Sequence, residues 1–277
     1  MHKTAIVDTI IKNTLNEDLV THDMTSEWLF DDTDHSKAYL IAKEDGILSG
    51  MNVFKRTFEC VDAQTLVEVM AKDGSPIKKG EIIAIIEGRT KSLLFAERTA
   101  LNFLQRMSGI ATETGKYVSA VKDLPVKIVD TRKTAPGLRI LDKQAVRDGG
   151  GSNHRFNLSD GILIKDNHIK AAGGIAYAIG KCKRHAPHTL KIEVEVESTI
   201  GMIEALEAGA DIIMLDNMTT AAMAEAVLIN AGRAILEASG NMTLTRLREV
   251  AETGVDIISI GALTHSVNAL DISLRFV

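Results

Sequence analysis

The chain has 277 residues, 45% hydrophobic and 25% charged, and its 32 Lys and Arg against 37 Asp and Glu give a net charge of −5. These figures are typical of a globular protein with one large or two medium domains, and they exclude a disordered chain. The acidic balance argues against a nucleic-acid partner, and no apolar run has the length of a signal peptide or membrane span, so we expect a cytoplasmic protein without a membrane partner.

The first part of the chain predicts a small α+β domain. Apolar residues at helical spacing over Ile6–Leu15 predict one or two amphipathic helices at the start. Short β-rich runs separated by Asp-Gly turns predict strands over 37–88, and an apolar stripe from Ser92 onward predicts a helix of about 30 residues. We place an α+β sandwich domain at residues 1–108 and expect residues 270–277 to complete it.

A repeated alternation of strand-like and helical segments follows. Because strands that alternate with helices form right-handed βαβ units, the pattern predicts a parallel sheet. At least six units without a dinucleotide-binding glycine motif favour an incomplete α/β barrel over residues 109–269, with its active site at the carboxyl ends of the strands. The six apolar runs begin at Val126, Gly161, Leu190, Asp211, Arg233 and Asp256.

Positive charge is concentrated between Asp130 and Lys170. This segment contains eight Lys and Arg and five Asp, which gives a net charge of +3. In an acidic protein this balance indicates an anionic ligand such as a carboxylate or phosphate. The cations that adjoin predicted strands are interpreted as functional: Arg132, Lys133 and Lys165. Those that recur every four residues predict the exposed surface of a helix: Arg139, Lys143 and Arg147. A glycine run precedes His154 and Arg155, which suit a carboxylate and equally suit a solvated loop.

Acidic and glycine-rich strand ends complete the candidate site. Glu193, Glu195 and Glu197 alternate along one strand and therefore share one face. Inside a barrel they need a lysine, a cation or a cationic transition state, and we favour Glu195, with Asp216 at the end of the next strand. Turns at Ser239, Gly240 and Asn241, and at Gly261, lead into helices and are typical of phosphate sites, although two capped connections without a ligand remain an alternative.

Eight segments together resemble the quinolinate phosphoribosyltransferases, also called carboxylating nicotinate-nucleotide pyrophosphorylases. They follow the order of that family along nearly the whole chain: ERTALNFLQRMSGIAT, DTRKTAPGLR, GGG followed by NHR, LIKDNH, EVEVES, MLDN, EASGN and IGALTHS. The sequence departs from the family at 19–22, which replaces a more glycine-rich turn, and at Asn241, where many relatives have glycine.

The resemblance implies that quinolinate reacts with phosphoribosyl pyrophosphate and Mg²⁺ to give nicotinate mononucleotide, pyrophosphate and carbon dioxide in NAD biosynthesis. It implies a homodimer, or a larger assembly, with a shared active site. The quinolinate carboxylates would be bound by Arg132, His154, Arg155, Lys165 and the neighbouring subunit's Arg98. The sugar phosphates would lie near Lys133, Ser239, Gly240, Asn241 and Gly261. The catalytic residues would be Lys165, Glu195 and Asp216, with the two acids holding the ribose hydroxyls and Mg²⁺, directly or through water.

Three other functions remain open from the sequence. A paralogous phosphoribosyltransferase-like protein encoded with molybdate transporters would share this architecture. The β-rich stretch is also similar to lipoyl or biotinyl carrier domains, although Lys43 and Lys72 lack the flanking pattern of a modified lysine. An aldolase-type barrel would use Lys165 to form a Schiff base.

Overall fold

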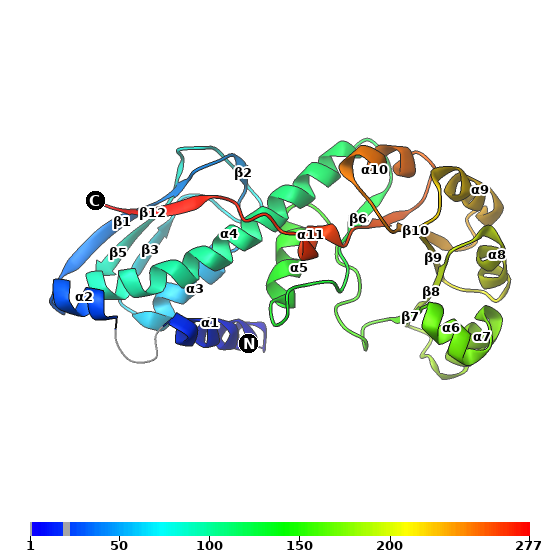
Figure 1. The fold of residues 1–277 in the computed structure, drawn as a ribbon, viewed down its shortest axis with the longest axis horizontal. Coiled ribbons are helices and arrows are strands. Elements are labelled where there is room, and N and C mark those ends of the chain that lie inside the picture. The colour runs from blue at the N-terminus through cyan, green and yellow to red at the C-terminus, as the bar shows by residue number, and fades with distance from the viewer. Residues whose placement is uncertain (1, 19–22) are drawn as a thin grey trace. The chain divides into compact units, whose positions relative to one another are not determined.

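The computed structural model describes residues 2–18 and 23–277, and the departure from the family at 19–22 lies outside them. The chain forms two compact units (Figure 1). Unit 1 comprises residues up to 115 together with 134–150 and 263–277, and unit 2 comprises 116–133 and 151–262. The domain boundaries expected from the sequence stay a prediction.

Unit 1 is built around a four-stranded antiparallel sheet in the order β12-β1-β5-β3. Its strands are β1 (His35–Ala42), β3 (Leu66–Val69), β5 (Ile82–Arg89) and β12 (Ile272–Phe276). Alternate residues of β1, namely Ala38, Leu40 and Ala42, are fully buried, as expected where one face of a sheet lies on the core. Figure 1 shows β12, in red, beside β1, in blue, and residues 272–276 pair antiparallel with 38–42.

Helices and a small second sheet complete unit 1. The helices are α1 (His2–Asp18), α2 (Met24–Leu29), α3 (Met51–Val61), α4 (Thr90–Ala120), whose last turns belong to unit 2, and α5 (Arg139–Asp148). The second sheet pairs β2 (Gly46–Ile47) with β4 (Pro76–Ile77). The long helix expected from Ser92 onward is confirmed as α4.

Helix α3 lies within the segment that the sequence predicted to be β-rich, and that prediction was wrong over its length. Met51, Phe54 and Phe58 are buried on one face of the helix, and the two phenylalanine rings are 5.1 Å apart. Their spacing of three and four residues is helical. The Asp-Gly turns predicted on both sides hid this pattern, because they were interpreted as hairpin connections.

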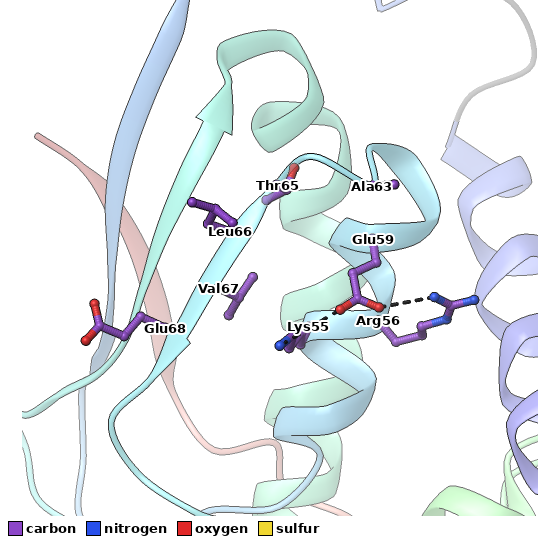
Figure 2. Close-up of a pocket in the computed structure, with 8 residues that line it drawn as sticks. All are labelled: Lys55, Arg56, Glu59, Ala63, Thr65, Leu66, Val67 and Glu68. Carbon is purple, nitrogen blue, oxygen red and sulfur yellow. Dashed lines mark hydrogen bonds and ion pairs between the residues drawn. The ribbon is translucent and has the colours of Figure 1, made fainter.

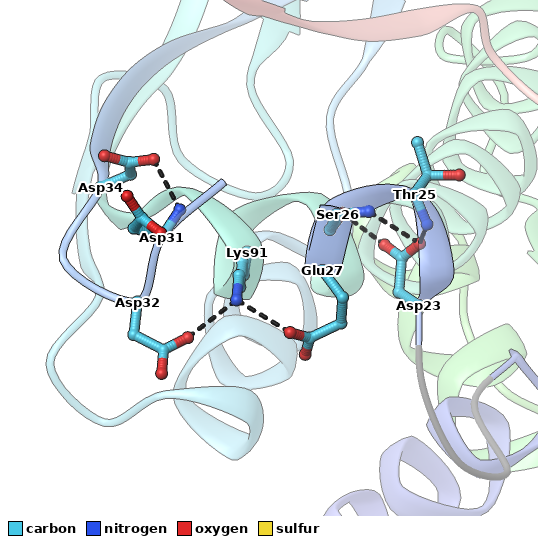
Figure 3. A network of polar contacts seen from close by, with 8 residues as sticks. All are labelled: Asp23, Thr25, Ser26, Glu27, Asp31, Asp32, Asp34 and Lys91. Carbon is cyan, nitrogen blue, oxygen red and sulfur yellow. Dashed lines mark hydrogen bonds and ion pairs between the residues drawn. The ribbon is translucent and has the colours of Figure 1, made fainter. Parts of the chain in front are cut away.

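An ion-pair network ties the beginning of unit 1 to α4. Lys91 Nζ lies 2.9 Å from Glu27 Oε2 and 2.8 Å from Asp32 Oδ1, as Figure 3 shows. Asp23 caps α2, and its carboxylate accepts the backbone N–H groups of Thr25 and Ser26. These contacts fix the position of the short helix α2. Trp28 on this helix is 82% exposed.

Unit 2 contains a six-stranded parallel sheet in the order β6-β11-β10-β9-β8-β7, which confirms the expected fold class. Strands β6 and β7 are its two edges, and no pairing joins them within the described residues, so the barrel is incomplete. The strands are β6 (Lys127–Val129), β7 (Ile162–Ile164), β8 (Ile192–Val196), β9 (Ile212–Asp216), β10 (Ile235–Ser239) and β11 (Ile257–Ser259).

Helices follow most of these strands, and polar caps fix where several begin. Ser198, Thr219 and Thr243 each accept a backbone N–H from the first turn of the helix that follows. The helices are α6 (Asp166–Ala172), α7 (Ile175–His185), α8 (Thr199–Glu207), α9 (Thr220–Asn230), α10 (Leu244–Ala251) and the short α11 (Ala262–His265).

One further expectation needs correction. Lys143 is only 1% exposed, so α5 does not present it to solvent, and the spacing of the basic residues did not reveal which face is covered. Cys60 and Cys182 are free thiols, and both are half-buried. No helix in the described part of the chain is long and apolar enough to cross a membrane.

Candidate active site

The parallel sheet of unit 2 collects the predicted polar residues at the carboxyl ends of its strands. Register pairs Ile164 with Val194 and Ser239 with Asp216. Because carboxyl ends of parallel strands meet at one edge, the residues that close β7, β8, β9 and β10 form one polar rim. We call this rim the carboxyl edge; it contains Lys165, Glu195, Asp216 and Ser239.

Lys165 and Glu195 form an ion pair across β7 and β8. Lys165 Nζ lies 2.5 Å from Glu195 Oε2, and the glutamate side chain is 12% exposed against 46% for the lysine. Lys165 also caps α6, where its backbone N–H donates to His168 Nδ1. The pair places one positive and one negative group together at the ends of β7 and β8.

Two arginines lie close together beside the carboxyl edge. Burial and the positive charge of Arg132 lower the pKa of Arg155, while Glu193 acts in the opposite direction. Arg155 Nη1 donates to the backbone carbonyl of Gly161 at 2.8 Å. Like charges held together at a half-buried site repel, and an anion between them would relieve that repulsion. The expectation that these two guanidinium groups bind a carboxylate or phosphate stays a prediction.

A buried acidic cluster lies deeper in the same sheet. His154 Nε2 is 3.2 Å from Glu193 Oε2 on β8 and 3.6 Å from Glu237 Oε2 on β10. Glu193 and Glu237 are 5% and 2% exposed, and the Oε1 atom of each has no hydrogen-bond partner within residues 2–18 and 23–277. Burial, followed by the charge of Glu193, raises the pKa of Glu237 to about 7.

Asp130 organises the loop that carries His154. This aspartate is fully buried and accepts hydrogen bonds from Asn153 Nδ2 at 2.7 Å and from the His154 backbone N–H at 2.8 Å. Ser152 also pairs with Val129 as an isolated parallel bridge beside β6. Asp130, which directly follows β6, therefore holds the loop that carries His154.

Left-handed backbone shapes the turns after β9 and β10. Asn217, Gly240 and Asn241 have φ values of 55°, 88° and 49°. Asn217 Nδ2 donates to Asp216 Oδ2 at 2.8 Å, and Asn241 Nδ2 donates to Asn217 Oδ1 at 3.2 Å. A Cβ at position 240 would lie 2.2 Å from Asn217 Oδ1, so glycine is needed there for space as well as for conformation.

The remaining predicted site residues are less tightly defined. Lys133 is exposed and donates its backbone N–H to Thr131 Oγ1. Gly261 follows β11 and is half-buried. Arg98 belongs to α4 in unit 1 and its side chain is exposed. The roles expected for these three residues stay predictions.

Comparison with known proteins shows that both parts of the chain match one enzyme family. Residues 23–108 match the N-terminal domain of quinolinate phosphoribosyl transferase, and residues 110–275 match its C-terminal domain. The chain belongs to the quinolinate phosphoribosyl transferase family. A probable carboxylating nicotinate-nucleotide pyrophosphorylase of Bacillus subtilis is 46% identical over 93% of this chain and 89% of its own length. The chloroplastic carboxylating enzyme of Arabidopsis thaliana is 43% identical over 99% of this chain and 84% of its own length.

Solved structures agree with the sequence relatives. The nicotinate-nucleotide pyrophosphorylase from Francisella tularensis is 39% identical and has a TM-score of 0.95, covering 99% of this chain and 96% of that one. NadC from Streptococcus pyogenes is 44% identical with a TM-score of 0.93, covering 98% and 97%. The resemblance to the quinolinate phosphoribosyl transferase family seen in the sequence is thus confirmed.

Two contacts of this family member were not predicted from the sequence. Glu237 was noted as a polar residue near a strand end, but its position beside His154 was not foreseen. Arg246 was not considered; its guanidinium donates to the carbonyl of Met218 at 2.7 Å and to that of Gly240 at 3.3 Å. It therefore joins the turns after β9 and β10.

A groove in unit 1 offers a contrast with this site. It lies between α3 and β3 and is lined by Lys55, Arg56, Glu59, Ala63, Thr65, Leu66, Val67 and Glu68 (Figure 2). Glu59 pairs there with both Lys55 and Arg56, so the nearby charges neutralise one another. None of the predicted site residues lines it.

Proposed function

We propose that this protein transfers the phosphoribosyl group of phosphoribosyl pyrophosphate to quinolinate and decarboxylates the product to nicotinate mononucleotide. Membership of the quinolinate phosphoribosyl transferase family supports this reaction. The observation that carries the proposal is that two half-buried arginines, Arg132 and Arg155, lie close enough for their charges to interact, in the same unit as the Lys165–Glu195 pair. Quinolinate carries two carboxylates, and such a group of cations suits a dianion better than a neutral substrate.

Binding of quinolinate would use the cations, and each has a distinct task. Arg132 and Arg155 would grip carboxylate oxygens, because guanidinium groups match carboxylates with two parallel hydrogen bonds. Lys165 would supply a point charge whose position is fixed by Glu195. Alignment of the quinolinate ring nitrogen with the anomeric carbon would then provide much of the rate enhancement.

Loss of pyrophosphate leaves positive charge on the anomeric carbon, and carboxylates can stabilise it. Glu195 and Asp216 end or nearly end neighbouring strands, so both can face the ribose. Their interaction with a cationic transition state would exceed that with the neutral sugar, which is the condition for catalysis. Backbone N–H groups near Ser239, Gly240 and Gly261 would hold phosphate oxygens.

We propose Mg²⁺ as the cofactor, held by Glu195 and Asp216 directly or through water. Carboxylate oxygens are the ligands that Mg²⁺ prefers, and these two lie on adjacent strands. When bound, Mg²⁺ neutralises charge on the pyrophosphate that leaves. Glu195 already pairs with Lys165, so its carboxylate would then be shared between the lysine and the ion.

Turnover of quinolinate tests the proposed function. The assay combines quinolinate, phosphoribosyl pyrophosphate and Mg²⁺ and measures carbon dioxide release. Arg132→Ala should raise the KM for quinolinate about ten- to hundredfold, the effect of losing charged hydrogen bonds. Arg184→Ala, an exposed arginine in the last turn of α7, is the matched control and should behave as wild type. No carbon dioxide from the wild-type protein would refute the function.

We also propose a homodimer in which the partner completes each site. Arg98 is exposed on α4 and does not follow a strand of the parallel sheet. This position favours its donation to the site of a second copy. Mixing inactive Arg98→Ala and Lys165→Ala chains should restore part of the activity, because one site in a mixed dimer then has both residues. Failure of rescue after verified subunit exchange would contradict sharing.

A further inference from the structure

Two asparagines have left-handed backbone in the turns that follow β9 and β10. Asn217 has a φ of 55° and Asn241 a φ of 49°. This region of backbone conformation favours glycine, and asparagine is tolerated there because its short side chain can form local hydrogen bonds. Both asparagines form such a bond, and the two bonds together lead to the carboxylate of Asp216.

The carboxylate of Asp216 sets the direction of both hydrogen bonds. A carboxylate can only accept, so Asn217 must present its NH₂ group, and Nδ2 donates to Asp216 Oδ2 at 2.8 Å. The carbonyl oxygen Oδ1 on the other side of the same amide then needs a donor. Asn241 Nδ2 is that donor, at 3.2 Å. We call this series, in which Asn241 holds Asn217 and Asn217 holds Asp216, the asparagine relay.

Other contacts keep Asn217 in place. Its backbone N–H donates to the carbonyl of Ser239 at 3.0 Å, which joins the end of β9 to the end of β10. A Cβ atom at position 240 would collide with the Asn217 side chain, so Gly240 leaves the space that this side chain fills. Arg246 donates to the carbonyls of Met218 and Gly240 and ties the same two turns together. Asn217 is therefore held at its backbone and at both ends of its amide.

We propose that Asn217 and Asn241 are positioning residues that orient the carboxylate of Asp216 for phosphoribosyl transfer. This inference rests on the proposed function, in which Asp216 stabilises positive charge at the anomeric carbon. Asn217 occupies Oδ2 of Asp216 and leaves Oδ1 for the sugar. Orientation matters because a carboxylate lowers the barrier most when it is already directed at the atom where charge develops.

A double-mutant cycle tests whether Asn241 acts through Asn217. Glycine suits a left-handed position, so Asn217→Gly and Asn241→Gly remove the two side chains without straining the backbone. The assay is pyrophosphate formation from quinolinate and phosphoribosyl pyrophosphate with Mg²⁺ in a single turnover, which product release cannot mask. Asn217→Gly should be about tenfold slower than wild type, and Asn241→Gly about three- to fivefold slower, the effect of one hydrogen bond each.

The two effects should not multiply, because either substitution breaks the relay. In the Asn217→Gly background, Asn241→Gly should change the rate less than about twofold. A double variant about thirty- to fiftyfold slower than wild type would instead show that Asn241 acts independently of Asn217, and it would overturn the proposal. So would a normal rate for Asn217→Gly. Ala231→Gly is the matched control, since Ala231 is exposed at the end of α9 with a φ of 45°, and it should match wild type.

Exchange of side-chain amide protons tests the relay without substrate. In the full-length protein with ¹⁵N-labelled asparagine, the NH₂ group of Asn217 should exchange with water about tenfold more slowly than that of Asn13, which is exposed on α1. Asn241→Gly should remove most of this difference, and Ala231→Gly should keep it. Identical exchange at Asn217 in wild type and Asn241→Gly would refute the relay. If the wild type forms no pyrophosphate, the proposed function fails, and the exchange result separately decides whether Asn241 holds Asn217.

Discussion

Replacing Glu237 by glutamine should change how the stability of unit 2 depends on pH. Burial and the charge of Glu193 raise the pKa of Glu237 from 4.5 to about 7 in the folded protein. The folded state therefore binds a proton more tightly than the unfolded state does. The stability that this proton provides is fully present below about pH 4.5 and is lost as pH rises through about 7. The pKa difference corresponds to about 3 kcal/mol.

Glutamine has nearly the same shape and cannot ionise, so Glu237→Gln should lose this dependence. The assay is hydrogen exchange of amides in β9 and β10, which gives the free energy of opening of unit 2. Between about pH 5 and about pH 8 the wild type should lose about 3 kcal/mol more than the variant. Glu197→Gln, an exposed glutamate just after β8, is the control and should follow wild type. Parallel profiles for wild type and Glu237→Gln would refute the reasoning.

Three further changes test other contacts of the site. Arg246→Met removes the link between the turns after β9 and β10, so the KM for phosphoribosyl pyrophosphate should rise about tenfold while that for quinolinate stays constant. Asp130→Ala removes the acceptor of two part-buried hydrogen bonds and should lower the free energy of opening by about 1–3 kcal/mol, measured by hydrogen exchange; unchanged exchange would contradict its anchoring role. Gly240→Ala forces a left-handed residue against Asn217 and should cost at least about 1–2 kcal/mol in thermal unfolding, whereas an unchanged melting temperature would show that the turn relaxes.

Most of the architecture could be predicted because buried parallel strands have short, continuous apolar sequences. Each of the six runs became a strand of unit 2, and the polar residues after them reached the carboxyl edge. The long helix α4 was equally clear from its apolar stripe. Helix α3 was missed, because its four buried apolar residues are few and lie between strong turn signals.

What the sequence could not give is which distant residues meet. Glu193 and Glu237 lie on strands separated by β9, and they become neighbours only through the order of the sheet and the loop that brings His154 between them. Likewise, the four-residue spacing of Arg139, Lys143 and Arg147 indicated a helix, but it did not indicate that the side of the helix with Lys143 is buried. The family resemblance suggested that His154 binds substrate, and only side-chain geometry points to its two internal partners.

The pairing of β12 with β1 has a consequence for how the chain is made. Strand β1 is synthesised early, yet one of its two neighbours, residues 272–276, emerges only after the whole of unit 2. Throughout that interval one side of β1 has unpaired backbone groups, the kind of edge that recruits foreign strands. A chain truncated shortly before Ile272 would therefore keep an open edge at β1 in its first sheet.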